Sequence, residues 1–322
     1  MKTENEMIRR LWSAAVAAWR PAWRTAWWVV RLTVPITLAM SCLDRLGVIG
    51  WVSHGLAPLF GLMGLPGDGA LVFLTGACSN LYAAVAVMAT LAIDYRSAII
   101  LAVMGLICHN LIIETAVQRR AGATGWQMAL LRVAAAVVAG VSLNLVLPAG
   151  LTGRLWFAEP AAAVTGWGGV LVAWAVTMAP LVAKMLALIV GLNVLQSVLR
   201  EFRIIDLLVI PLRPLMRVFG LADSTSFLWV ICNVVGLTYG GAAIIDEVRD
   251  GRATPAEVRR LNAHVALSHS LLEDTLLFAT VGLPLFWLLV PRMVLAAIVV
   301  WVQRLACRLT GKRSLRRQPV TQ

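Results

Sequence analysis

The chain has 322 residues, of which 60% are hydrophobic and only 14% are charged, and its formal net charge is +12. This composition is typical of a membrane protein and excludes an ordinary water-soluble domain. Basic residues gather at the chain ends and in a few loops, which indicates membrane orientation and argues against nucleic-acid binding. The five cysteines form no CxxC pair, so buried free thiols are expected.

Residues 1–25 are predicted to form an interfacial amphipathic helix, because tryptophans and arginines recur there at helical spacings. Eight longer stretches are predicted to cross the membrane, since each approaches the roughly 20 residues that a helical crossing needs. In chain order they are 27–46, 70–91, 94–120, 126–147, 167–199, 227–248, the helix from Thr254 through His269, and 283–309. Two short stretches, 47–65 and 204–221, contain prolines and are predicted to be broken or re-entrant elements. The fold class is therefore an all-α polytopic membrane protein.

Two of these helices carry start signals. Asp94 is an N-cap candidate for the helix that follows it. Thr254 is a second candidate, and Glu257 three residues later completes a predicted capping box.

One heptapeptide pattern occurs twice, 160 positions apart, as His109-Asn-Leu-Ile-Ile-Glu-Thr115 and His269-Ser-Leu-Leu-Glu-Asp-Thr275. Other pairs keep the same order, among them Leu-Ala-Pro-Leu at 56–59 with Leu-Arg-Pro-Leu at 212–215, Gly76 with Gly236, Trp126 with Trp287, and Arg132 with Arg292. The pattern predicts an internal duplication. It divides the chain into the anchor 1–25, a first repeat 26–150, a linker 151–166, a second repeat 167–310 and a basic tail 311–322.

The number of crossings decides how the two repeats are related. If both short stretches cross, each half crosses five times and the halves are inverted; if neither crosses, each half crosses four times and the halves are parallel. Inversion places Arg119, Arg120, Arg200 and Arg203 on the same side as both termini. The positive-inside rule therefore favours inverted repeats with cytoplasmic N- and C-termini.

The repeated pattern supplies the candidate binding residues, because titratable side chains in lipid are costly and point to function. They are His109, Asn110, Glu114 and Thr115 in the first copy, and His269, Ser270, Asp274 and Thr275 in the second. Three interpretations stay open: coordination of a solute or ion, hydrogen bonds that lock the repeats together, and a proton relay. On an ideal helix His109 and Glu114 do not share one narrow face, which weakens a simple ligand pair.

Further candidates lie outside the repeated pattern. Lys184 falls near the middle of a long predicted helix and is expected to pair with Asp274 or Glu114, unless a tilted helix brings it to water. Asn80, Asn233 and Thr238 lie in two helices rich in small residues. These helices are predicted either to break around a solute or to pack tightly.

Other chemistry finds little support. HExxH, P-loop, GxSxG and GxGxxG motifs are all missing, so neither an enzyme nor a cofactor is predicted. No metal site is assigned, although a set built from Cys78, Cys108, His109 and His269 is a minor alternative.

Two stretches carry a family resemblance: Leu-Ala-Pro-Leu-Phe-Gly-Leu-Met-Gly-Leu at 56–65 and Leu-Arg-Pro-Leu-Met-Arg-Val-Phe-Gly-Leu at 212–221. Each precedes a small, polar helix, and Asn-Val-Val-Gly-Leu at 233–237 resembles a run in spore-maturation membrane proteins. The chain thus resembles the nucleoside-recognition, or Gate, domain family of bacterial membrane proteins, which includes the membrane part of ferrous-iron transporter B. The resemblance implies two Gate-like copies that cover most of residues 26–310.

These observations predict a multi-pass protein of the bacterial inner membrane that moves a small solute or ion, either a nucleoside-like solute or a cation. The site would lie between the two repeats. The alternative is a non-transporting membrane scaffold, as the spore-maturation resemblance allows. The expected partners are the lipid bilayer and the small solute or ion, with a homo-oligomer left open.

Overall fold

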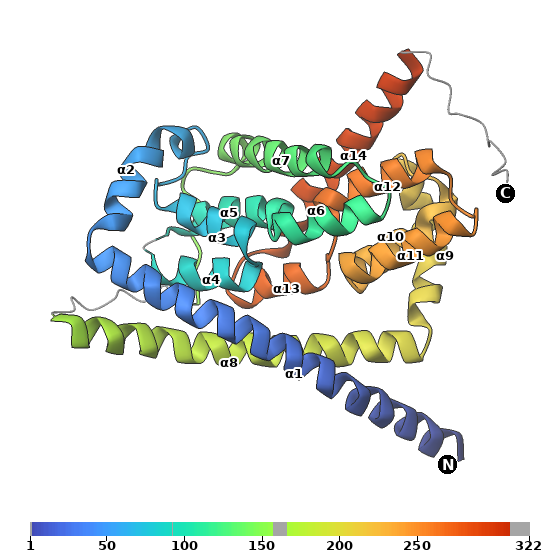
Figure 1. The fold of residues 1–322 in the computed structure, drawn as a ribbon, viewed down its shortest axis with the longest axis horizontal. Helices are drawn as coiled ribbons and strands as arrows, with labels where there is room; N and C mark the ends of the chain where they lie inside the picture. The colour runs from blue at the N-terminus through green and yellow to red at the C-terminus, as the bar shows by residue number, and fades with distance from the viewer. Residues whose placement is uncertain (1, 92, 157–165, 310–322) are drawn as a thin grey trace.

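The computed structural model describes residues 2–91, 93–156 and 166–309, and the secondary structure of these residues is entirely helical (Figure 1). The predicted basic tail 311–322 and most of the predicted linker 151–166 lie outside the described residues. Within the described part, five stretches are long and apolar enough to cross a membrane: 5–45, 95–120, 125–146, 166–201 and 285–309. The chain is therefore an all-helical polytopic membrane protein.

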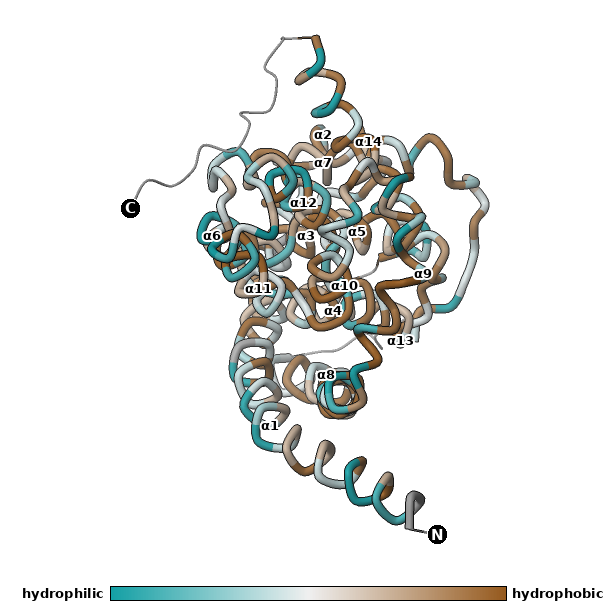
Figure 2. The backbone as a smooth tube through the Cα atoms, turned by 90° about the vertical axis from the view of Figure 1, so that its right-hand side faces the viewer, coloured by the Kyte–Doolittle hydropathy of each residue, from teal (hydrophilic) through white to brown (hydrophobic). Residues whose placement is uncertain are grey.

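Four long helices form the outer part of the fold. They are α1 (Lys2–Arg45), α7 (Gly125–Val146), α8 (Gly166–Glu201) and α14 (Leu285–Leu309). The bounds of α7, α8 and α14 lie within about two residues of the predicted crossings. The predicted interfacial helix 1–25 and the crossing 27–46 form one continuous helix, because Pro21 does not interrupt α1. In both Figures 1 and 2, α1 and α8 pack together along one side of the remaining helices.

Two predicted crossings, 70–91 and 227–248, fold instead as helical hairpins. The first consists of α3 (Gly69–Cys78) and α4 (Leu81–Thr90), and the second of α10 (Ser226–Val234) and α11 (Leu237–Arg249). The legs of each hairpin pack against each other. A Cβ placed on Gly76 would lie 3.2 Å from Cβ of Ala84, and one placed on Gly240 would lie 3.0 Å from Cα of Cys232. The legs have 9 to 13 residues and extend about 14–20 Å, less than the thickness of a bilayer core, so the prediction of one continuous crossing helix is wrong for both stretches.

Two more predicted crossings break in the middle. The first divides into α5 (Tyr95–Cys108) and α6 (Leu111–Arg120), and the second into α12 (Pro255–Ser268) and α13 (Glu273–Thr280). Of the eight predicted transmembrane helices, four are therefore hairpins or broken helices, although residues 95–120 together are long enough to cross a membrane. Hydropathy alone does not detect such breaks, since the residues on both sides are apolar.

The short elements are α2 (Val48–Gly61) and α9 (Ile204–Val218), followed by the 3-10 helix η1 (Asp223–Thr225). Each forms a single helix, α2 with Pro58 inside it and α9 with Pro211 and Pro214 inside it. The prediction of broken or re-entrant elements at 47–65 and 204–221 is therefore wrong. The helical hairpins occur directly after these elements instead.

Both predicted helix starts are confirmed. The Asp94 carboxylate accepts a hydrogen bond from the Ser97 N–H, and Thr254 and Glu257 form a complete capping box. These caps begin the two helices that later break at the histidines. Each cap fixes the residue at which its helix begins, and the helix then extends to the histidine at its other end.

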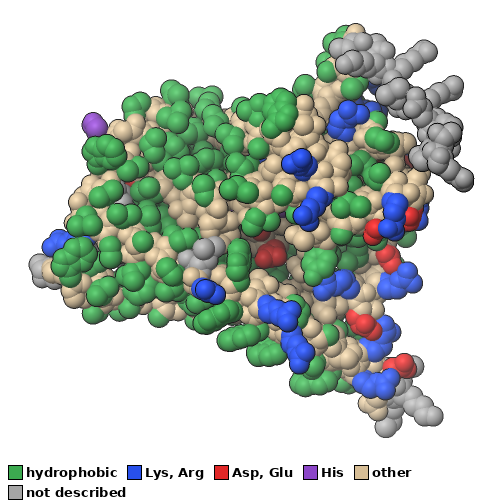
Figure 3. Space-filling model, in the orientation of Figure 1, with side chains coloured by type: hydrophobic (Ala, Val, Ile, Leu, Met, Phe, Trp, Pro, Cys, Tyr) green, Lys and Arg blue, Asp and Glu red, His purple; other side chains and the backbone are tan. Residues whose placement is uncertain are grey.

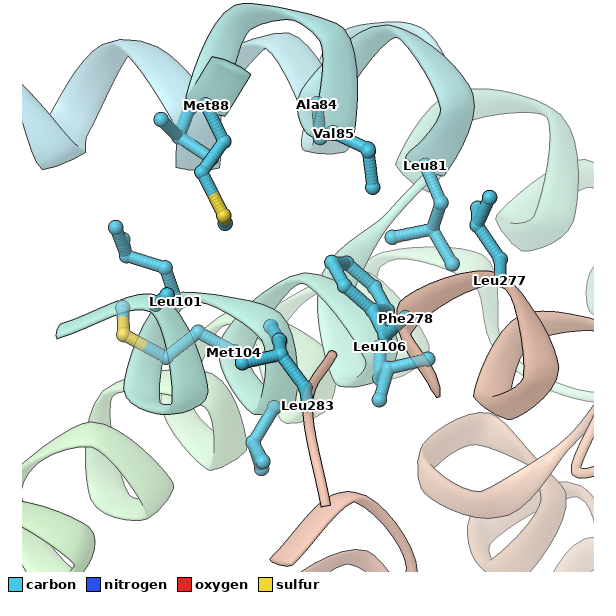
Figure 4. Packing of buried hydrophobic residues seen from close by; sticks show 14 of the residues in the cluster. Leu81, Ala84, Val85, Met88, Leu101, Met104, Leu106, Leu277, Phe278 and Leu283 are labelled. Carbon is cyan, nitrogen blue, oxygen red and sulfur yellow. The ribbon is translucent and has the colours of Figure 1, made fainter. Parts of the chain in front are cut away.

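The core lies where the first hairpin packs on the broken helices. Figure 4 shows α4 side chains facing α5 and α13, with Met88 opposite Leu101, and Leu81 and Val85 opposite Leu106 and Phe278. The neighbouring residues of α5, from Ala98 to Cys108, are all buried. This apolar packing supports α5 up to the residue before His109.

Charged side chains are distributed unevenly over the face in Figure 3. Most of the Lys, Arg, Asp and Glu side chains gather at the right-hand end, where α1 begins and α14 ends, whereas the left-hand part is mainly hydrophobic. Seen from that right-hand side in Figure 2, hydrophilic segments lie on α6 and α12.

Candidate functional site

The two histidines of the repeated pattern end the first halves of the broken helices. His109 follows α5 and His269 follows α12, and both have extended backbones with ψ of 162° and 167°. The next residues, Asn110 and Ser270, have left-handed φ values of 47° and 52°. Residues other than glycine seldom adopt this conformation, so its occurrence at both corresponding positions marks a constrained local structure.

The hairpins supply hydrogen-bond partners to the backbone at these breaks. The Asn110 N–H donates to the Gly76 carbonyl over 2.9 Å, and the Ser270 N–H donates to the Cys232 carbonyl over 3.0 Å. The Leu272 N–H donates to the Asn233 carbonyl over 3.3 Å. Irregular backbone is tolerated at membrane depth only where protein satisfies its polar groups, and the hairpins do so here.

The left-handed turn also redirects the side chains. After it, Glu114 points back toward His109, with Oε1 of the carboxylate 3.0 Å from Nε2 of the imidazole. An uninterrupted helix would have separated these two side chains around its circumference. The break therefore brings together a pair that ideal helical geometry argued against.

Glu114 joins the two halves of the chain. Its Oε2 lies 3.0 Å from Nε2 of His269 and 2.6 Å from Nη2 of Arg132. Asp274 completes the cluster, with Oδ2 3.4 Å from Nε2 of His109. All these side chains are buried, and the two imidazole centroids are 5.1 Å apart. The predicted meeting of the His109 and His269 helices thus occurs at four titratable residues.

Each histidine is oriented by its own helix. Nδ1 of His109 lies 3.1 Å from the Gly105 carbonyl oxygen, and Nδ1 of His269 lies 2.8 Å from the Val265 carbonyl oxygen. A carbonyl oxygen can only accept, so Nδ1 carries the hydrogen in both rings. Both Nε2 atoms consequently face the carboxylates.

Two buried arginines donate hydrogen bonds to carbonyl groups at the C-terminal ends of α5 and α12. Arg132 donates to the Ile107 and His109 carbonyls over 2.9 and 2.6 Å. Arg292 donates to the Ser268 and His269 carbonyls over 3.2 and 3.1 Å. The last carbonyls of a helix lack intrahelical partners and carry partial negative charge, so a guanidinium both satisfies and neutralises them.

Other predicted site residues lie around this cluster. Asn80 separates the legs of the first hairpin and caps α4, accepting from the Ala83 N–H, while Asn233 donates to the Trp229 carbonyl. The hydroxyl groups of Thr115 and Thr275 are buried and make no hydrogen bond among the described residues. These two hydroxyls are thus available to a polar ligand.

Two predictions about individual residues need correction. Lys184 is exposed and lies over the Trp156 ring, 3.1 Å from its centroid, so the expected pairing with Asp274 or Glu114 is wrong. The carboxylates already have histidine and arginine neighbours, and the cation–π contact gives the ammonium an alternative partner. Thr238, a predicted site residue, is also exposed, on the first turn of α11, and is not one of the buried residues of the cluster.

Four polar residues that shape the site are absent from the candidates predicted by sequence motifs. Two of them, Arg132 and Arg292, occupy corresponding positions of the repeats. Tyr82 donates from its hydroxyl to Glu273 over 3.2 Å, which links the first hairpin to α13. An arginine within an apolar helix is a functional signal by itself, so the arginines could have been found from the sequence.

The comparisons with known proteins agree with this picture of a membrane protein. The family model described as "Nucleoside recognition" (Gate) matches residues 26–124, which lie in the predicted first repeat. The "Uncharacterized membrane protein YvoD" of Bacillus subtilis strain 168 is 31% identical over 272 residues, covering 84% of this chain and 87% of the relative. No solved structure gives a significant match. The chain belongs to the nucleoside-recognition (Gate) family of bacterial membrane proteins.

Proposed function

We propose that the protein moves a small polar solute or an ion across the bacterial inner membrane, through the site formed by Glu114, Asp274, His109 and His269. The observation that carries this proposal is the convergence of two broken helices and two half-length hairpins on one buried titratable cluster. Discontinuous helices near the bilayer midplane supply binding groups in transporters. A nucleoside-like solute or a cation fits the mixture of carboxylates, imidazoles and free hydroxyls.

The proposal includes the order of helices in the two halves of the chain. Each half would consist of a long helix, a short helix, a hairpin, a broken helix and a final long helix. In Figure 1, α1 and α8 run in opposite directions, as do α5 and α12, and α7 and α14. These directions support inverted repeats with three crossings and one half-depth hairpin in each half.

The charge distribution supports an orientation for this arrangement. Four arginines near helix ends are exposed, namely Arg119, Arg120, Arg200 and Arg203. In Figures 1 and 3, α1 starts and α14 ends at the same end of the molecule. Cytoplasmic loops are enriched in arginine and lysine. We therefore assign this end, with both termini, to the cytoplasm.

Reconstituted liposomes test the proposal. Purified protein is incorporated into liposomes, and uptake of labelled nucleosides, divalent cations and organic acids is measured. We expect uptake of one class, and a loss of at least about tenfold in Glu114→Gln and in Asp274→Asn, because each removes a charged group from the site. Asp206→Asn, which changes an exposed acid paired with Arg203, is the control and should retain uptake.

The alternative of a membrane scaffold predicts a different result. In that case no solute of any class enters the liposomes. Glu114→Gln would then reduce protein stability or association with partner proteins in cells, without any transport activity to lose. That combination would contradict the transport proposal.

A further inference from the structure

We propose that Nε2 of His109, Nε2 of His269 and the Asp274 carboxylate form a binding site for a divalent transition-metal ion. This inference rests on the proposed transport function, because it names the class of ion that the same site carries. The three ligand atoms lie within 4.8 Å of one another, and all three residues are buried. His109 belongs to the first broken helix, α5 and α6, whereas His269 and Asp274 belong to the second, α12 and α13, which lies far away in the sequence.

The hydrogen bonds of the imidazoles support a metal site. Because Nδ1 of each ring donates to a backbone carbonyl, each neutral ring directs the Nε2 lone pair into the cluster. Metal-binding histidines characteristically donate their other ring N–H to a carbonyl or carboxylate, which orients the ring. His109 and His269 both have this arrangement, and both obtain it from the residue four positions earlier.

The carboxylates support a cation at the same point. Two neutral imidazole lone pairs directed at carboxylate oxygens 3.0 Å away repel them, unless a positive charge lies between the groups. A divalent ion supplies that charge. Protons on both imidazoles would supply it too, so the experiment must separate a metal ion from bound protons.

The spacing suits a metal ion after small side-chain movements. Ligands about 2.0–2.2 Å from a tetrahedral ion lie about 3.4 Å from one another. The separation of His109 Nε2 and Asp274 Oδ2 is already 3.4 Å. Glu114 is held by Arg132 over 2.6 Å and lies beside this set, where it adds negative charge and can accept from a metal-bound water.

The overall charge and the donor types select the class of ion. Two imidazole nitrogens and the Asp274 carboxylate, with the Glu114 carboxylate beside them, offer lone pairs that coordinate a cation and repel an anion. Imidazole nitrogen with carboxylate oxygen suits zinc, iron(II), cobalt(II) or manganese(II), whereas magnesium and calcium prefer oxygen alone.

Equilibrium binding to the purified protein tests the inference. The full chain in detergent is treated with a chelator and dialysed against Zn²⁺ or Co²⁺, and bound metal is measured by mass spectrometry. We expect one ion for each chain, and a Co²⁺ absorption spectrum of a four-coordinate site with nitrogen and oxygen ligands. His269→Gln and Asp274→Asn should weaken binding by about 100-fold, since even loss of an outer partner of a metal ligand costs 10–100-fold.

His54→Gln is the matched control, because His54 is exposed on α2 and should contribute only adventitious metal binding. Binding that persists in Asp274→Asn and His269→Gln, or that disappears in His54→Gln, would overturn the assignment. Should a variant fail to fold, the stoichiometry and the Co²⁺ spectrum of the unaltered protein still decide the question.

The same preparations separate this inference from the transport proposal. Liposomes that take up a nucleoside or an organic acid while the protein binds no metal would refute the metal site and support transport. Metal binding at the site without movement of any solute would refute transport. Metal binding together with uptake of the same ion, both lost in Asp274→Asn, is the expected result.

Discussion

At the scale of single residues, Glu114 is the point at which the two halves of the chain meet. Its carboxylate contacts an imidazole from each half and a guanidinium from α7. A buried carboxylate needs such partners, because its removal from water is costly unless charge and hydrogen bonds compensate it. Arg132 is the partner closest to the carboxylate, with Nη2 2.6 Å from Oε2.

Replacing Arg132 should therefore be more damaging than its isolated position in the sequence suggests. Arg132→Met leaves Glu114 without its guanidinium and the Ile107 carbonyl without a donor. We expect a loss of about 3–5 kcal/mol in the free energy of unfolding, the usual cost of breaking a buried ion pair. Denaturant titration in detergent measures it.

A double-mutant cycle provides the control, in which Arg132→Met and Glu114→Gln are measured singly and together. Removing the unpaired charge should recover part of the lost stability, so that the double variant is more stable than Arg132→Met alone. Strictly additive losses would show that the two side chains do not interact.

Among the helices, the amino-acid sequence predicts the ends far better than the breaks. The ends of α7 and the caps at Asp94 and Thr254 agree with prediction because caps and polar turns are local signals. The break at His109 and Asn110 has no glycine or proline to announce it. It is stabilised by a hydrogen bond to Gly76, which is distant in the sequence. Tertiary contacts therefore produce this break.

The left-handed residue at the second break gives a direct test. Ser270 has φ of 52°, which glycine adopts freely and a β-branched residue adopts at a cost. We expect Ser270→Val to lower the free energy of unfolding by about 1–2 kcal/mol and Ser270→Gly to lower it less. Chemical denaturation of both variants compares them. Equal losses would mean that the side chain, rather than the backbone conformation, determines stability here.

The start of α12 predicts a pH effect. Burial raises the pKa of Glu257, but hydrogen bonds from the Thr254 N–H, the Thr254 hydroxyl and the Ser224 hydroxyl outweigh it, so the pKa lies below its ordinary value. A depressed folded-state pKa contributes stability that is present above the unfolded pKa of about 4.3 and is lost as pH falls through the folded value. The cap therefore weakens in acid.

Thermal melts at a series of pH values check this expectation. On acidification below about pH 4.3, the unaltered protein should lose more stability than Glu257→Gln, whose amide has no charge to titrate. Comparison of the two proteins cancels the effect of all other titrating groups. Parallel pH profiles would exclude a contribution from this cap.

At the scale of the whole molecule, the proposed inversion makes corresponding residues of the two repeats face opposite sides of the membrane. Arg120 and Thr280 are 160 positions apart, both are exposed, and each lies in the last turn of its half-helix. Single cysteines at these positions, in a chain whose own cysteines are replaced, can be labelled with a membrane-impermeant maleimide. We expect Thr280→Cys to react from outside the cell and Arg120→Cys to react only in inverted vesicles.

Labelling of both cysteines from the same side would support parallel repeats. The arginines of the sequence favoured inversion with five crossings in each half, whereas the arrangement proposed above has three. The proposed number depends on hairpins that turn back at half depth, and these hairpins form through packing between α3 and α4 and between α10 and α11.

The length of α1 has a consequence for biosynthesis. With 44 residues it extends about 66 Å, roughly twice the hydrocarbon thickness, and it contains five arginines between Arg9 and Arg31. Because α1 precedes every other described helix in the chain, its arginines reach the membrane before those helices do. The side on which they remain then determines the side from which each later hairpin must enter. The arginines of α1 thus act on the orientation of all the described helices that follow it.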